Sequence, residues 1–84
     1  MISLKDVSVN KSTVSVSWNN SYDSISLLSI VFDDDGSCTN VGLEPTSLSF
    51  STKNLSQYRD YVVYLKALTE DGWVTSDKKE FRLA

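Results

Sequence analysis

Apolar and polar residues alternate along most of this chain. The longest alternation places an apolar residue at every second position from Tyr61 to Ala67. Val14, Val16 and Trp18 follow the same rule, with Ser residues between them. Because successive side chains of a strand point to opposite faces, this period of two predicts half-buried β-strands. Shorter runs of the same kind contain Leu48, Phe50, Phe81 and Leu83.

The segment ISLLSIVF, residues 25–32, is apolar on both sides. One side carries Ile25, Leu28, Ile30 and Phe32. Leu27 and Val31 fall on the other side, where they would form an apolar strip on the outside of a sheet if nothing covered them. We therefore expect this strand to have one face in the core and the other available for contact.

Turn signals separate the runs. DDDG ends at Gly36 and EDG ends at Gly72, and Asp-Gly between alternating runs predicts β-hairpins. The sequence shows no apolar period typical of a helix. Six or seven short strands with turns between them indicate an all-β antiparallel sandwich. At 84 residues, the chain is expected to form one domain, residues 1–84.

The order and spacing of the apolar residues resemble the fibronectin type III domain. Trp18 matches the tryptophan that ends the family's second strand, and ISLLSIVF matches its third strand. Leu55 and Tyr61 match the leucine and the "tyrosine corner" six residues apart at the sixth strand. The resemblance implies a seven-stranded antiparallel immunoglobulin-like sandwich, with Leu55 closing one end and Tyr61 tying the connecting loop across it. The loop TEDGW lacks Arg-Gly-Asp, so receptor binding through that tripeptide is not implied.

Composition argues against several functions. The chain has no histidine, so a Ser-His or Cys-His nucleophile pair cannot form, and we expect neither an enzyme nor a cofactor. The net charge is −3, which does not favour nucleic acid as a partner. No apolar run approaches the length of a membrane span, and a small-molecule ligand is not expected. Cys38 is the only cysteine, so no internal disulfide forms, and we interpret it as an ordinary loop or edge residue.

The stretch DDDGSCTNVGLE invites a calcium-binding interpretation. Its acidic and serine positions fit an EF-hand loop in part, from Asp33 to Glu44. That loop needs glycine at the sixth place, where this chain has Cys38, and it needs flanking helices. We therefore predict a solvated hairpin turn and no metal site.

The candidate docking surface consists of residues that alternation places away from the core. They are Leu27, Val31, Tyr64 and Trp73. Trp73 directly follows the Asp71-Gly72 turn, and exposed aromatic residues at such positions are common contact residues. The alternatives are that its ring folds over the edge of the sandwich or packs on Tyr64.

These observations favour a non-enzymatic structural or protein-binding module. We expect a small accessory or decoration protein that docks on a larger assembly such as a phage capsid, with a capsid protein as partner and a virion-surface or extracellular location. One alternative is a spacer or adhesion module of a larger bacterial or extracellular surface protein or secreted enzyme. Another is a carbohydrate-binding module that uses Trp73 and tyrosines for stacking.

Overall fold

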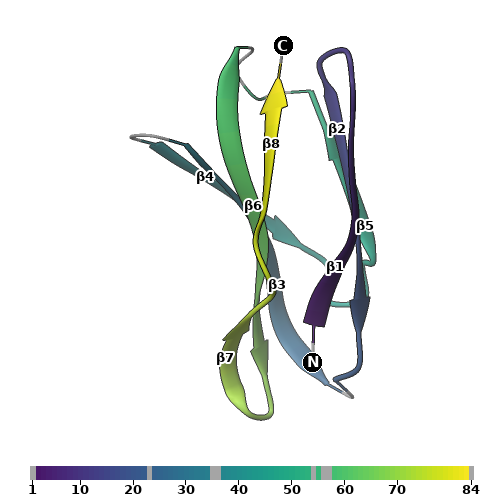
Figure 1. Ribbon diagram of the computed structural model, residues 1–84. Coiled ribbons are helices and arrows are strands. Elements are labelled where there is room, and N and C mark those ends of the chain that lie inside the picture. The colour runs from purple at the N-terminus through teal and green to yellow at the C-terminus, as the bar shows by residue number, and fades with distance from the viewer. Residues whose placement is uncertain (1, 23, 35–36, 54, 56–57, 84) are drawn as a thin grey trace.

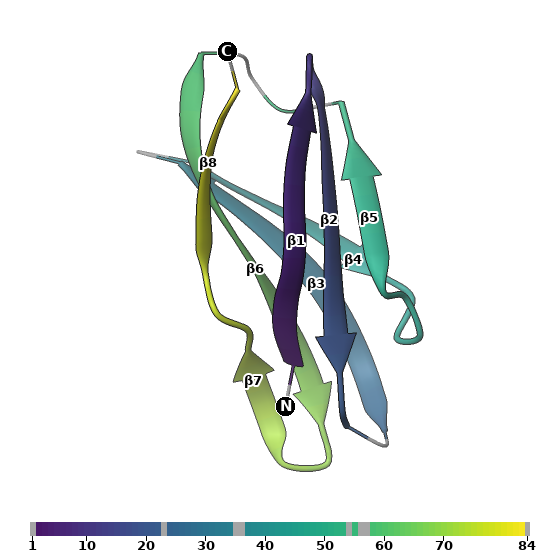
Figure 2. The ribbon, with the colours of Figure 1, turned by 45° about the vertical axis from the view of Figure 1, so that its right-hand side comes forward.

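The computed structural model describes residues 2–22, 24–34, 37–53, 55 and 58–83. Within these residues, eight strands form two antiparallel sheets that lie face to face (Figures 1 and 2). One sheet has the order β1-β2-β5, from β1 (Ile2–Asn10), β2 (Thr13–Asn20) and β5 (Ser49–Thr52). The other has the order β4-β3-β6-β7, with β8 also paired to β6: β3 (Ile25–Asp34), β4 (Ser37–Leu43), β6 (Arg59–Thr69), β7 (Gly72–Thr75) and β8 (Lys79–Leu83). None of the described residues forms a helix long and apolar enough to cross a membrane. The predicted all-β antiparallel sandwich is confirmed.

The eighth strand is the one difference from the seven that we expected. Two short strands share one side of β6, since β8 pairs with its first half and β7 with its second half. Ser76 lies between them. Its N–H donates to the carbonyl of Leu65 at 2.9 Å, and its hydroxyl accepts from the Leu65 N–H at 2.9 Å. The final strand is therefore split in two, and a serine side chain maintains the pairing of β6 at the gap.

The core lies between the inward faces of the two sheets. Trp18 is only 2 % exposed, and its indole N–H donates to the main-chain carbonyl of Ser47 at 3.0 Å. This satisfies the one polar group that a buried tryptophan brings with it. The other buried residues of the cluster are Ile2, Leu4, Val14, Val16, Leu28, Ile30, Phe32, Leu55, Tyr61, Val63, Leu65, Ala67 and Leu83. The predicted core positions of Trp18 and Tyr61 are confirmed.

A register shift explains the pattern of β3. The pairing of β3 with β6 shifts between Ile25 and Leu27. The extra residue changes the phase of alternation, so Ile25 and Leu28 both face the core although they are three positions apart. Leu27 is left on the outer face.

One end of the sandwich is closed by Leu55, Tyr61 and Phe81. Leu55 is buried, and the ring of Tyr61 stacks on that of Phe81 with 5.5 Å between ring centroids. The position of Leu55 agrees with its expected role as a plug. The tie between the Tyr61 hydroxyl and the connecting loop stays a prediction.

Candidate docking face

A tight turn between β6 and β7 sets the position of Trp73. Gly72 has a φ of +96°, a conformation that residues with a side chain rarely adopt. The Thr69 hydroxyl accepts from the N–H of Asp71 at 3.0 Å and donates to the carbonyl of Gly72 at 3.1 Å. Both ends of the turn are thus held by one buried threonine. As the second residue of β7, Trp73 then lies opposite Leu68 on β6.

Leu27, Leu68 and Trp73 form a continuous row across three neighbouring strands. Leu27 on β3 pairs with Leu68 on β6, which pairs with Trp73 on β7. Leu27 is 55 % exposed and Trp73 is 54 % exposed, on the face of the five-stranded sheet that points away from the core. Isolated exposed apolar residues are common, but residues directly opposite on adjacent strands make one contiguous apolar patch.

Two lysines lie over the aromatic residues of this face. The Nζ of Lys66 is 5.1 Å from the ring centroid of Trp73, and the Nζ of Lys78 is 5.0 Å from that of Tyr64. A cation over an exposed ring contributes about 0.5 to 1 kcal/mol and restrains the orientation of the ring. We call the outer surface formed by Leu27, Tyr64, Lys66, Leu68 and Trp73 the docking face.

The structure places all four predicted residues on the same side of the sheet, but Val31 is not exposed. Val31 pairs with Tyr64 on one side and Asn40 on the other, and it is only 2 % exposed. The expectation that it forms part of an open strip is therefore wrong. Val31 stands on an interior strand of the sheet, between β4 and β6, and not at an open edge. Tyr64 is half-buried, and Leu27 and Trp73 are open to solvent.

Leu68 is a residue that sequence reasoning missed. It lies at the centre of the row, between Leu27 and Trp73. Alternation buries Tyr61, Val63 and the later odd positions of β6. It therefore places the even positions, Leu68 among them, on the outer face, and this could have been inferred from the sequence. On the outer face of β6, Lys66 lies between Tyr64 and Leu68, and Trp73 lies opposite Leu68. The ring of Trp73 is therefore next to Lys66 and does not pack on Tyr64, as one alternative proposed.

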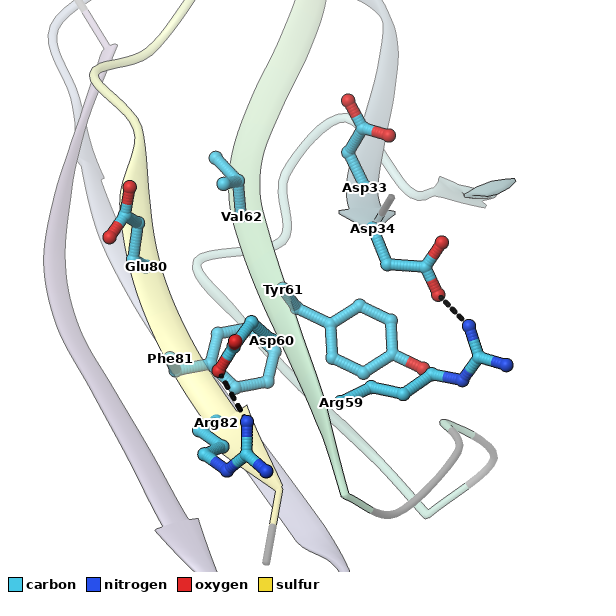
Figure 3. A pocket seen from close by; sticks show the side chains of 9 residues that line it. All are labelled: Asp33, Asp34, Arg59, Asp60, Tyr61, Val62, Glu80, Phe81 and Arg82. Atoms are coloured by element: carbon cyan, nitrogen blue, oxygen red, sulfur yellow. Dashed lines mark hydrogen bonds and ion pairs between the residues drawn. The ribbon is translucent and has the colours of Figure 1, made fainter. Parts of the chain in front are cut away.

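A pocket of about 680 Å³ lies elsewhere, where β3 ends beside the first half of β6 and β8 (Figure 3). Six charged side chains contribute to its lining: Asp33, Asp34, Arg59, Asp60, Glu80 and Arg82. Arg59 forms an ion pair with Asp34 at 3.3 Å, and Arg82 forms one with Asp60 at 3.0 Å. Its size would suit a small molecule, but such sites are mostly apolar with few polar groups. Both arginines of this pocket are already paired with carboxylates.

Comparison with known proteins shows likeness at the level of structure. Models of known protein families and a search of curated proteins give no match. Among solved structures, the FN3 domain of human collagen XX has 18 % identity and a TM-score of 0.77, covering 96 % of this chain and 90 % of that one. The chicken CNTN1 FN1–FN3 domains have 20 % identity and a TM-score of 0.75, covering 95 % of this chain but only 31 % of that one. A myokine structure has 17 % identity and a TM-score of 0.72, covering 96 % and 95 %.

The chain has a fibronectin type III-like fold. This confirms the fold that the spacing of Trp18, Leu55 and Tyr61 indicated. In this fibronectin type III-like sandwich, the docking face lies on strands of the larger sheet and not on the loops at either end. Rigid strands fix the relative positions of Leu27, Leu68 and Trp73.

Among the described residues, no three His, Cys, Asp or Glu side chains gather closely enough to hold a metal ion. Of the positions that fit an EF-hand loop in part, Asp35 lies outside the described residues. Asp33 pairs with Cys38 near the start of β4, whereas Glu44 follows the end of β4.

Cys38 is exposed on β4, the edge strand of the larger sheet, as expected for an ordinary edge residue. Because its side chain adds nothing to the core, we predict that Cys38→Ser changes the unfolding free energy of this fibronectin type III-like domain by less than about 1 kcal/mol. Urea unfolding followed by tryptophan fluorescence measures this change. A larger loss would contradict the exposed position of Cys38.

Proposed function

We propose that this domain is a non-enzymatic protein-binding module that docks on a larger protein assembly through the docking face. The observation that carries the proposal is the row formed by Leu27, Leu68 and Trp73. Its two outer members are more than half exposed, although the chain is small and has few large apolar residues to leave in water. Such a contiguous patch of apolar side chains on the outer face of a sheet supports a role in contact.

The form of the patch supports a protein as the partner. A specific interface buries about 800 Å² on each side, with most of the binding energy at a few aromatic anchors. Trp73 is suited to this role because the Thr69 turn and the cation of Lys66 hold it in place before binding. A pre-positioned side chain loses less conformational entropy on association.

Two lysines lie beside the aromatic rings of the docking face, Lys66 within it and Lys78 over Tyr64. Lys66 and Lys78 carry positive charge beside the rings, whereas the net charge of the chain is −3. Complementary charge mainly sets specificity and association rate. We therefore propose a partner surface with an apolar centre and carboxylates close to it. A phage capsid or an extracellular surface protein could present such a surface.

Carbohydrate binding has less support from the same geometry. Stacking on sugars needs a platform of exposed rings. On this face Trp73 is the ring that is more than half exposed, and Tyr64 is half-buried beneath Lys78.

The experiment measures recruitment of the purified domain to the parent assembly from its native source. The double variant Trp73→Ser with Tyr64→Ser is expected to bind at least about tenfold more weakly than the parent, because it removes both aromatic anchors. Its thermal unfolding should remain cooperative, since neither ring belongs to the core cluster.

A matched control removes as much exposed apolar surface elsewhere. Leu48 is 56 % exposed and Tyr58 is 73 % exposed, and both lie outside the docking face. The variant Leu48→Ser with Tyr58→Ser should be recruited like the parent. Equal recruitment of both double variants would contradict the proposal and favour a passive spacer.

A further inference from the structure

The docking face is too small to form a whole interface. It consists of a few side chains around Trp73, whereas a specific interface involves about 20 to 30 residues on each side. Beyond Leu68 and Trp73, the pairing of β6 with β7 ends after one more pair, Thr69 and Gly72. Along β6, the outer face therefore continues in the other direction, past Tyr64 and into the first half of this strand.

A second row of residues crosses this first half of β6. Asp33 on β3 pairs with Val62 on β6, which pairs with Glu80 on β8. Val62 lies between two buried residues of β6, so the row belongs to the outer face, and Figure 3 shows the two carboxylates on either side of Val62. At about 3.3 Å per residue, Val62 lies about 20 Å from Leu68 on the same face.

The carboxylates of this row are the ones that the pocket leaves without a positive partner. The pocket of about 680 Å³ is lined by four carboxylates and two guanidinium groups, a net charge of −2. The guanidinium groups pair with Asp34 and Asp60. Within the described part of the chain, Asp33 and Glu80 form no ion pair, and both are exposed. Two strand spacings, about 10 Å, separate their main chains across Val62.

We infer that the protein bound by the docking face also presents a lysine or arginine to this row, between Asp33 and Glu80. Such a side chain lays its aliphatic stem on the half-buried Val62 and directs its charge to the carboxylates. Two carboxylates that flank an aliphatic residue match both parts of a long cationic side chain. The inference rests on the proposed function and extends it, because the interface then covers the outer face of the sheet from Leu68 to Val62.

The charge changes sign along this outer face. Lys66 and Lys78 lie beside the rings of Trp73 and Tyr64, and the unpaired carboxylates lie farther along the sheet. A partner with carboxylates near its apolar centre and a basic group about 20 Å away matches this order in one orientation. The reversed orientation opposes like charges at both ends. The second row therefore determines how the domain is oriented on its partner.

Recruitment of the purified domain to the parent assembly tests the inference. Asp33→Asn with Glu80→Gln removes both charges and retains the size of the side chains, and this variant should bind at least about tenfold more weakly than the parent. Its binding should also depend less on salt between about 50 and 300 mM, because an ionic contact is lost. Thermal unfolding should be unchanged, since both carboxylates are exposed and form no ion pair among the described residues.

The matched control makes the same change of net charge on the other sheet. Asp6→Asn with Ser49→Lys adds as much positive charge as the test variant, at exposed positions of β1 and β5. This control should be recruited like the parent. A control weakened as much as the test variant would show that net charge alone is responsible, and would overturn the inference.

The two proposals fail in different ways. If Trp73→Ser with Tyr64→Ser weakens recruitment but Asp33→Asn with Glu80→Gln does not, the docking face stands and the contact with a cationic side chain is overturned. If neither variant weakens recruitment, both the docking face and its extension are overturned.

Discussion

Replacing Trp18 with alanine is expected to lower the unfolding free energy by about 3 to 5 kcal/mol. The indole is 2 % exposed and lies in the core cluster between the two sheets. Its removal takes away buried apolar surface, leaves a cavity and frees the main-chain carbonyl of Ser47 from its indole donor. Since a domain of this size is stabilised by about 5 to 10 kcal/mol in total, the variant should be close to unfolding at 37 °C.

Equilibrium urea unfolding of the parent, Trp18→Ala and Trp18→Phe measures this effect. Phenylalanine fills most of the volume but cannot donate to Ser47, so it should cost less than alanine and separate the packing contribution from the hydrogen bond. Circular dichroism is the suitable signal, because the substitution also removes a fluorophore. An alanine variant with the same midpoint as the parent would show that Trp18 is not a core residue.

Ser76→Ala is expected to cost about 1 to 3 kcal/mol, a large effect for the loss of one hydroxyl. The Ser76 hydroxyl accepts from the Leu65 N–H at 2.9 Å and donates to the carbonyl of Asp77 at 2.8 Å. Leu65 is fully buried, so its N–H has no access to water once the hydroxyl is removed. An unsatisfied buried donor costs more than an average hydrogen bond contributes.

The control for this prediction is Ser76→Thr, which keeps the hydroxyl. Urea unfolding should show a smaller loss for threonine than for alanine. Amide hydrogen exchange should show that the Leu65 N–H exchanges faster in the alanine variant than in the parent. In the same variant, the core amides of β2 should exchange more slowly than the Leu65 N–H. An alanine variant as stable as the parent would contradict the bridging role of Ser76.

Much of the fold could be predicted from alternation alone. The run from Tyr61 to Ala67 has an unbroken period of two and forms the long central part of β6. Trp18 and Leu55 could be placed in the core because their spacing to neighbouring strands is typical of this sandwich. These positions are dictated by burial, which leaves a periodic signal in the sequence.

Other features depend on contacts that no local pattern contains. The phase change in β3 requires the register shift between Ile25 and Leu27, and the burial of Val31 depends on which strands flank it. The gap between β7 and β8 is bridged by Ser76, which as a single polar residue gives no periodic signal. The row of Leu27, Leu68 and Trp73 follows only from the pairing of β3 with β6 and of β6 with β7, which no local pattern gives.

The most direct test of the docking face is site-specific photo-crosslinking in the native source. A photoreactive phenylalanine analogue is placed at Trp73 in one variant and at Tyr58 in another, since both positions are exposed and aromatic but only Trp73 belongs to the docking face. We predict that position 73 cross-links to one discrete protein of the parent assembly and that position 58 does not. Cross-linking from position 58 alone, or from neither position, would contradict the account.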